Sequence, residues 1–378
     1  MLGAIIGDMV GSIYEFNPIK TKDFNIYNPE MRMTDDSYLT MAVAKALLKQ
    51  YPFFGNLCDP TEKEAIQKDL RKEFLKAFHE HPTAGYGGMF YMWCKECEEK
   101  GEVVPAYNSY GNGSAMRISP VGWIADTQNE VKILSKLVTE ITHNHPEGLK
   151  GAEAIAMAVY LAKEKYTKEE IKQIMIHDYY PEIANFDFDD LVKNYEFSEI
   201  CQKSVPQAIY CFLISNSLED AIRNCIAIGG DCDTTACMAG AIAEAFYNRD
   251  SVSKFEETFM YLKFDKEDEE FIKKFYKIVN VNKWLALEDF NKIEPLKRPI
   301  SYYLDPRIYN PLVYVLEEKL GVKTIQELID QDEDLVNEAI KYIPEDLSQD
   351  YIADFLEKLN DIRGNLVEMV ELNPDFKK

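Results

Sequence analysis

The chain has 378 residues, 46% of them hydrophobic, which is enough to bury the core of one large domain or two ordinary ones. Its 65 Asp and Glu against 42 Lys and Arg give a formal net charge of −23. This charge disfavours a nucleic-acid phosphate backbone as the main partner, because such binding relies on clustered basic side chains. No signal-peptide pattern and no apolar run near the roughly 18 residues of a membrane span is found. We therefore expect a globular cytoplasmic protein with no membrane partner.

Apolar residues recur with the helical period along most of the chain, whereas sustained period-two alternation is absent. The pattern predicts helices over 36–49, 63–79, 129–141, 149–164, 218–228 and 233–247. The last of these is apolar nearly all round and rich in Ala and Gly, which is typical of a helix at the centre of a bundle. We therefore predict an all-α fold.

The first notable stretch in chain order is GDMVGSIYEF, residues 7–16. Its small residues predict a helix that carries Asp8 and presents Glu15 at its end.

A second acidic stretch, Thr34-Asp35-Asp36, precedes the apolar face of the helix predicted over 36–49. One carboxylate at this position is explained by a helix N-cap and an acidic first turn that complements the helix dipole. Capping does not explain the adjacent second carboxylate, which indicates a positive charge nearby.

The eight cysteines are scattered, and several lie in apolar helical stretches, which favours reduced core residues over a disulfide framework. One local pair has C-x-x-C spacing and follows two histidines, so a zinc site is an alternative, although the spacing matches no standard zinc finger. The residues concerned are Cys94, Cys97, His79 and His81. We favour core packing for the two cysteines.

Two polar loops occupy the middle of the chain. NSYGNGSAMR, residues 108–117, contains glycines that let backbone N–H groups approach an anion or a sugar. THNHPEG, residues 142–148, carries two imidazoles, for which a metal, a phosphate or an ordinary turn all remain open.

The helix predicted over 233–247 is entered through IGGDCDTT, where Asp231 and Asp233 are two residues apart in a glycine-hinged turn. If this turn faces Thr34-Asp35-Asp36, four carboxylates repel one another and require raised pKa values or a cation. Oxygen ligands of this kind suit Mg²⁺, Mn²⁺ or Ca²⁺, and the set is large enough for two ions. The alternative is that each turn is an independent acidic helix cap.

Six motifs in this order resemble the ADP-ribosylglycohydrolase family, which includes dinitrogenase-reductase-activating glycohydrolase and the ADP-ribosyl-acceptor hydrolases. They are GAIIGDMVGSIYEF, MTDDS, AGYGGMF, NSYGNGSAMR, THNHPEG and GGDCDTTACMAGAIAEA. The resemblance implies an all-α, orthogonally packed helical bundle with a binuclear Mg²⁺ or Mn²⁺ centre. It covers roughly the first 280 residues, so we expect a catalytic domain over 1–280.

The resemblance also assigns roles to residues of this chain. It implies metal ligation by Thr34, Asp35, Asp36, Asp231, Asp233 and Thr234, and catalytic roles for Glu15, Asp35 and Asp233. It implies contacts with ADP-ribose by Gly87, Gly88, Ser109, Tyr110, Gly111, Asn112, Gly113 and His143. The chain departs from the usual pattern at Ser37, Tyr38 and Cys232, none of which replaces an expected ligand.

The implied reaction is hydrolysis of the glycosidic bond between ADP-ribose and an acceptor such as an arginine or serine side chain. The expected role of Glu15 is to orient or deprotonate the attacking water or to assist the leaving group, with Asp35 as the alternative. Two other functions stay open: a non-catalytic ADP-ribose-binding protein, and an all-α metal-dependent phosphohydrolase that uses His177-Asp178. The second lacks suitably placed further histidines, since the chain has only five.

Residues 281–378 lie beyond the resemblance. They contain acidic amphipathic patterns that predict a helical extension, and the Pro- and Tyr-containing stretch 294–312 within them is the predicted linker. Its predicted role is packing, dimerisation or recognition of a protein partner.

Overall fold

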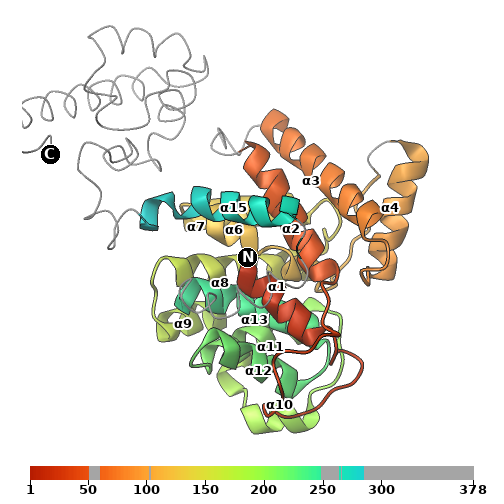
Figure 1. Ribbon diagram of the computed structural model, residues 1–378. Coiled ribbons are helices and arrows are strands. Elements are labelled where there is room, and N and C mark those ends of the chain that lie inside the picture. The colour runs from red at the N-terminus through yellow and green to blue at the C-terminus, as the bar shows by residue number, and fades with distance from the viewer. Residues whose placement is uncertain (51–59, 102–103, 248–263, 265, 285–378) are drawn as a thin grey trace, which may run out of the picture. The chain divides into compact units, whose positions relative to one another are not determined.

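The computed structural model describes residues 1–50, 60–101, 104–247, 264 and 266–284 (Figure 1). These residues form helices and no strand, which confirms the all-α prediction; Gly111 and Ile200 make one isolated antiparallel bridge. The helices are α1 (Leu2–Gly11), α2 (Asp35–Gln50), α3 (Pro60–Glu80), α4 (Gly88–Lys100), α5 (Gly113–Met116), α6 (Ser119–Ile124), α7 (Gln128–Thr139), α8 (Pro146–Lys163), α9 (Lys168–Asp178), η1 (Pro181–Asn185), α10 (Phe188–Asn194), α11 (Cys201–Leu213), α12 (Leu218–Ile228), α13 (Cys232–Tyr247) and α15 (Lys266–Trp284).

Local sequence explains where several helices begin. The Thr127 and Ser217 hydroxyls cap α7 and α12 by accepting hydrogen bonds from the N–H groups of Glu130 and Asp220. Thr167 and Glu170 form a capping box at the start of α9. All six helices predicted from periodicity are present, with ends that differ by at most a few residues.

Helix α13 lies at the centre of the compact unit Met1–Phe271, because every residue from Cys232 to Ala245 is buried. It packs against α1 at very short range through glycines of α1. A Cβ atom at Gly7 would lie 2.0 Å from the carbonyl oxygen of Ala236, and one at Gly11 would lie 2.2 Å from the Cα atom of Asp233. This approach brings the acidic N-terminus of α13 against the C-terminal half of α1.

Helix α1 is shorter than predicted. It ends at Gly11, and residues up to Glu15 form a turn in which the N–H groups of Tyr14 and Glu15 both donate to the carbonyl oxygen of Gly11. The close contact of Gly11 with Asp233 explains why a glycine stands there. Glu15 therefore lies on a turn rather than at a helix end.

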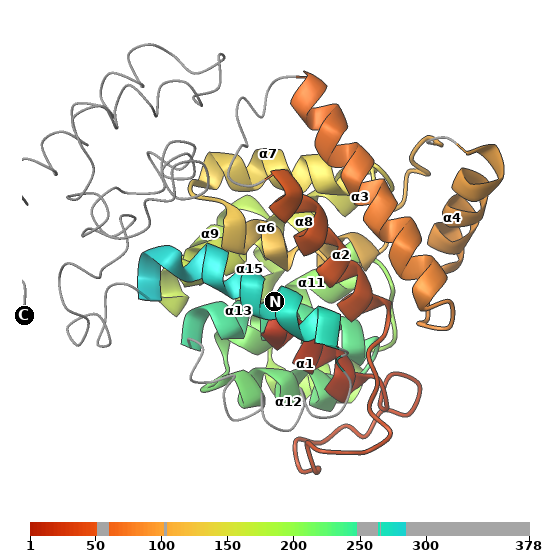
Figure 2. The same ribbon diagram turned by 45° about the horizontal axis from the view of Figure 1, so that its top comes forward.

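Helix α2 carries Asp35 and Asp36 in its first turn and packs side by side with α3 (Figures 1 and 2).

Contacts divide the chain into two units, Met1–Phe271 and Ile272–Lys378. The predicted linker and nearly all of the predicted extension over 281–378 lie outside the described residues, so the predicted boundary at residue 280 stays a prediction.

Candidate metal centre and substrate loops

Three buried carboxylates from three helices meet where α1, α2 and α13 converge. Asp8, Asp36 and Asp233 each place a carboxylate oxygen within 4.8 Å of the others. Their exposed fractions are 0%, 2% and 4%. The two acidic stretches therefore face each other, as expected from sequence, and Asp8 joins them.

Hydroxyl groups connect these carboxylates. The Thr34 hydroxyl donates to Asp8 Oδ1 at 2.6 Å and lies 3.3 Å from Asp36 Oδ2. The Thr234 hydroxyl reaches the same Asp36 oxygen at 3.2 Å. Asp36 Oδ1, by contrast, is buried and has no hydrogen-bond partner within the described part of the chain.

A second group shares Asp233 with the first. Glu15, Asp231 and Asp233 place carboxylate oxygens within 4.8 Å of one another, and only Glu15 is partly exposed. Asn112 donates from Nδ2 to Asp231 Oδ2 at 2.6 Å, so the predicted substrate loop also touches this group.

Asp35 belongs to neither group. Its backbone N–H donates to the carbonyl oxygen of Ala84 at 2.9 Å, and its Oδ1 atom lies 3.5 Å from the Cβ position of Gly85. Its carboxylate thus faces the loop that precedes α4. Gly87 and Gly88 lie exposed at the start of α4, with open space around their Cβ positions.

Burial and mutual repulsion disfavour the charged forms of the carboxylates at this centre. Burial raises the pKa of Asp8 and of Asp231 to about 6. Burial, followed by repulsion from neighbouring carboxylates, raises the pKa values of Asp36 and Asp233 well above their usual range. Burial and the charge of Asp233 raise the pKa of Glu15 to about 8.

These features fit a hard divalent cation. The donor set consists of carboxylate and hydroxyl oxygens, which Mg²⁺, Mn²⁺ and Ca²⁺ prefer. A bound cation would offset the repulsion and give Asp36 Oδ1 a partner.

The predicted substrate loop, residues 109–113, is held by a segment that the sequence analysis did not single out. The N–H of Asn112 donates to the carbonyl oxygen of Glu199 at 2.8 Å, and the N–H of Cys201 donates to that of Tyr110 at 3.0 Å. Ser109 accepts from the N–H of Gly111 through its hydroxyl at 3.0 Å. The Tyr110 ring is 46% exposed, so it is available to a ligand.

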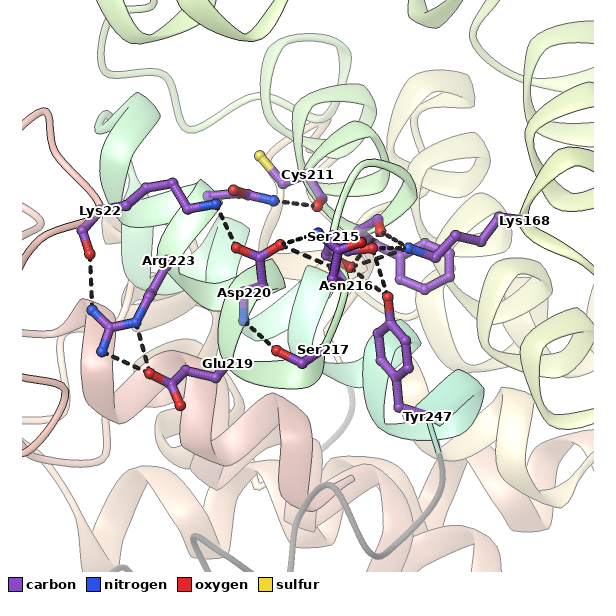
Figure 3. Close-up of polar contacts among 12 residues, drawn as sticks. Lys22, Lys168, Cys211, Ser215, Asn216, Ser217, Glu219, Asp220, Arg223 and Tyr247 are labelled. Carbon is purple, nitrogen blue, oxygen red and sulfur yellow. Dashed lines mark hydrogen bonds and ion pairs between the residues drawn. The ribbon is translucent and has the colours of Figure 1, made fainter.

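The segment after Glu15 is tied to the residues that precede Asp231. Lys20 donates from Nζ to the carbonyl oxygens of Ile228 at 2.6 Å and Tyr195 at 2.8 Å. Further along, Arg223 donates to the carbonyl oxygens of Lys22 and Phe24, as Figure 3 shows for Lys22. These two basic side chains fix residues 20–24, which follow Glu15, to α12.

The two alternative sites considered from sequence, the zinc site and the His177-Asp178 site, are not assembled in the described residues. Cys94 and Cys97 are buried, while His79 pairs with Glu98 on the surface at 3.0 Å. His177 is 89% exposed and pairs with Asp178. In the described ranges, no group of metal-ligating side chains includes these cysteines or histidines, which disfavours the zinc site and the phosphohydrolase function.

Comparison with known proteins agrees with the geometry. The family model for ADP-ribosylglycohydrolase matches residues 1–258. The chain belongs to this family. The resemblance stated from six motifs is thereby confirmed, and so is the prediction of a glycosidic-bond hydrolase.

Among similar ADP-ribosylglycohydrolase relatives is "ADP-ribosylhydrolase ARH3" of Homo sapiens, 27% identical over 318 residues, with 67% of this chain and 85% of the relative covered. The Gallus gallus protein of the same name is 26% identical over 324 residues, with the same coverage. A solved "ADP-ribosylglycohydrolase-related protein complex" matches with a TM-score of 0.55 at 20% identity, covering 74% of this chain and 97% of that one. The solved structure supports the fold alone.

None of the helices in the described residues is long and apolar enough to span a membrane.

Proposed function

We propose that this ADP-ribosylglycohydrolase is a cytoplasmic hydrolase that uses two divalent cations, Mg²⁺ or Mn²⁺, to release ADP-ribose from an acceptor. The acceptor is a protein side chain such as arginine or serine, or another ADP-ribosylated group. One observation carries the proposal: two groups of buried carboxylates share Asp233, and Asp36 Oδ1 lacks a partner among the described residues. The names of the relatives point to the same reaction class.

The proposed cation ligands are the six residues named from sequence, Thr34, Asp35, Asp36, Asp231, Asp233 and Thr234, with Asp8 and Glu15 added by their positions. When bound, divalent cations hold ribose hydroxyls, acidify a water and offset charge at an oxocarbenium-like transition state. Asp35 is the proposed ligand nearest to the loop that precedes α4.

Glu15 is the group proposed to orient the attacking water and take its proton. Its carboxylate lies beside Asp231 and Asp233 but is only half-buried, so it reaches both the centre and the solvent side. Asp35 is the alternative base. A general base must lie within hydrogen-bond reach of the proton that it removes.

The loop 109–113 and His143 are proposed to hold the diphosphate of ADP-ribose. Backbone N–H donors and an imidazole bind an anion without many Lys or Arg side chains. This role is compatible with a chain of net charge −23 that acts on an anionic substrate.

The test is release of ADP-ribose from arginine-, serine- and nucleic-acid-linked substrates, with Mg²⁺, Mn²⁺ or EDTA, by the unmodified chain and by Asp233→Asn. We expect cation-dependent release that Asp233→Asn abolishes, and the preferred acceptor identifies the substrate class. Binding of ADP-ribose without release from any acceptor would instead support a non-catalytic ADP-ribose-binding protein.

A further inference from the structure

Arg117 is a buried cation directly behind His143. Its side chain is 1% exposed, and its Nη2 atom donates to the Thr142 hydroxyl at 2.6 Å. The same atom lies 3.4 Å from His143 Nδ1. The guanidinium carbon lies 4.5 Å from the centre of the Phe74 ring and 5.5 Å from that of Phe90, which offsets part of the cost of burial.

The direction of these hydrogen bonds follows from donor chemistry. A guanidinium only donates, so the Thr142 oxygen accepts from Arg117, and its own hydrogen is free to point elsewhere. His143 Nδ1 lies 2.9 Å from that oxygen. Nδ1 therefore faces one group that can only donate, Nη2 of Arg117, and one hydroxyl whose hydrogen can turn toward it. An acceptor at Nδ1 satisfies both contacts, and a neutral ring then carries its hydrogen on Nε2.

The opposite side of the ring faces the substrate loop. His143 Nε2 lies 3.5 Å from the Cβ position of Gly113 and 3.7 Å from that of Gly111. Both distances are ordinary van der Waals contacts, so the Nε2 edge of the imidazole lies directly against the two glycines. Within the described ranges no hydrogen bond engages Nε2, so its N–H is available to a ligand above the loop.

We propose that Arg117 is a positioning residue that, with Thr142, fixes His143 as the neutral Nε2–H tautomer, which donates to an anionic oxygen held over Gly111–Gly113. The identification of this anion as the diphosphate of ADP-ribose rests on the proposed function. The tautomer itself follows from contacts within this chain.

The surroundings keep the ring neutral. Burial and the charge of Arg117 lower the pKa of His143 well below its usual value. The titratable groups that act on Arg117 are Tyr107, Cys94 and Asp35. Arg117 itself has a pKa of about 10, lowered mainly by burial, so it stays charged at neutral pH.

The first experiment reads the tautomer without any activity. Long-range ¹H–¹⁵N spectra of the full chain labelled at histidine assign the His143 signals by comparison with His143→Gln. We expect an unprotonated Nδ1 and a protonated Nε2 from pH 5.5 to 8. An Nδ1–H tautomer, or titration of His143 in this range, would overturn the proposal.

The role of Arg117 is read in the same spectra with Arg117→Met, for which we expect a mixture of tautomers. Thr142→Val and Thr142→Ser form a second pair that does not depend on the Arg117 variant folding. The valine removes the hydroxyl, so it should also give a mixture, and the serine should restore the single tautomer. Unchanged spectra in Thr142→Val and in folded Arg117→Met would contradict the positioning role.

The donor role is tested by calorimetric titration with ADP-ribose. Glutamine places its amide nitrogen near the Nε2 position, whereas asparagine cannot reach it. We expect His143→Asn to weaken ADP-ribose binding roughly ten- to a hundredfold and His143→Gln to weaken it far less. Equal losses in the two variants, or none, would overturn the donor role. If the unmodified chain shows the expected tautomer but binds no ADP-ribose, the proposed function fails while the tautomer assignment stands.

Discussion

The carboxylate of Asp8 accepts hydrogen bonds from both the backbone N–H of Thr34, at 2.9 Å, and its hydroxyl, at 2.6 Å. The backbone N–H and hydroxyl of Ser37 donate to the same carboxylate. Asp8 therefore orients the start of α2, whose first residues are proposed cation ligands.

Replacement of Asp8 by asparagine should damage this arrangement. An amide offers one acceptor oxygen and turns an N–H₂ group toward donors, so we expect a loss of about 1–3 kcal/mol in the free energy of unfolding. The affinity for Mg²⁺ should fall as well. Urea denaturation and calorimetric Mg²⁺ titration measure the two effects. Asp187→Asn is the control, because asparagine is also a good cap for α10. Equal behaviour of the two variants would contradict the role of Asp8.

Divalent cations should stabilise the folded chain. A ligand that binds only the folded state at 100 times its Kd adds about 2.7 kcal/mol of stability. We expect Mg²⁺ or Mn²⁺ to raise the Tm and EDTA to lower it, and Asp36→Asn to remove the effect. The exposed Asp178→Asn should retain it. A cation-dependent rise in Tm that survives in Asp36→Asn would place the cation elsewhere.

Lys20→Met should lower turnover by roughly ten- to a hundredfold, because a displaced Glu15 segment misplaces its carboxylate. The Kd for ADP-ribose should change little, since Lys20 bonds only carbonyl oxygens outside the substrate loop. Lys22→Met is the matched control: Lys22 pairs with Asp220 in a partly exposed ion pair (Figure 3). Steady-state kinetics and binding separate the two effects. A similar loss in both variants would point to a general effect on the segment.

Gly7→Ala should lower the stability of the unit Met1–Phe271 and also disturb its carboxylate centre. The added methyl group would lie 2.0 Å from the Ala236 carbonyl oxygen, so α1 and α13 must separate, at a cost of about 1–3 kcal/mol or more. Asp8 and Asp233 then move apart. Thermal unfolding with and without Mg²⁺ should show a lower Tm and a smaller response to the cation. Full retention of the response to Mg²⁺ would mean that the contact between α1 and α13 does not set the positions of Asp8 and Asp233.

The Lys168 amine should make stability depend on alkaline pH. It donates to the carbonyl oxygens of Phe212 and Leu213 at 3.0 and 3.2 Å. It also donates to the carbonyl oxygen of Ser215, which Figure 3 labels beside it. Burial lowers its pKa from 10.5 to about 8. Between these values the unfolded chain binds more protons, so this group adds stability as pH rises.

The measurement is the difference in unfolding free energy between the unmodified chain and Lys168→Met at pH 7.5 and pH 10, which cancels the titration of other groups. We expect the unmodified chain to be favoured more at pH 10. A difference that shrinks as the pH rises would show instead that the carbonyl oxygens require a charged amine.

Sequence predicted the helices and the two acidic turns because each leaves a local mark: apolar residues at helical spacing, or paired carboxylates at a helix start. The sequence assigns no role to Asp8, since a single aspartate between apolar residues does not reveal that Thr34 and Ser37 donate to it. Its burial in an all-apolar helix was the signal that could have indicated a partner.

Lys20 and Arg117 could not be assigned from sequence for a different reason. The partners of Lys20 are backbone carbonyl oxygens more than 170 positions away, and backbone acceptors leave no trace in residue type. Arg117 closes a motif that was read as a backbone loop, whereas its contacts come from α3, α4 and Thr142. The segment 199–201 that holds the substrate loop is likewise unmarked in sequence.

The packing of α1 against α13 has a consequence for synthesis. Gly3 and Glu244 are hydrogen-bonded across 241 positions, so the two halves of the acidic centre leave the ribosome far apart in time. Contacts of such long sequence separation form late in folding. A nascent chain that has not yet exposed α13 cannot place Asp233 beside Asp8 and Asp36. We therefore expect the proposed divalent cation to bind only after the whole helical unit has been made, and uptake of the cation to report its completion.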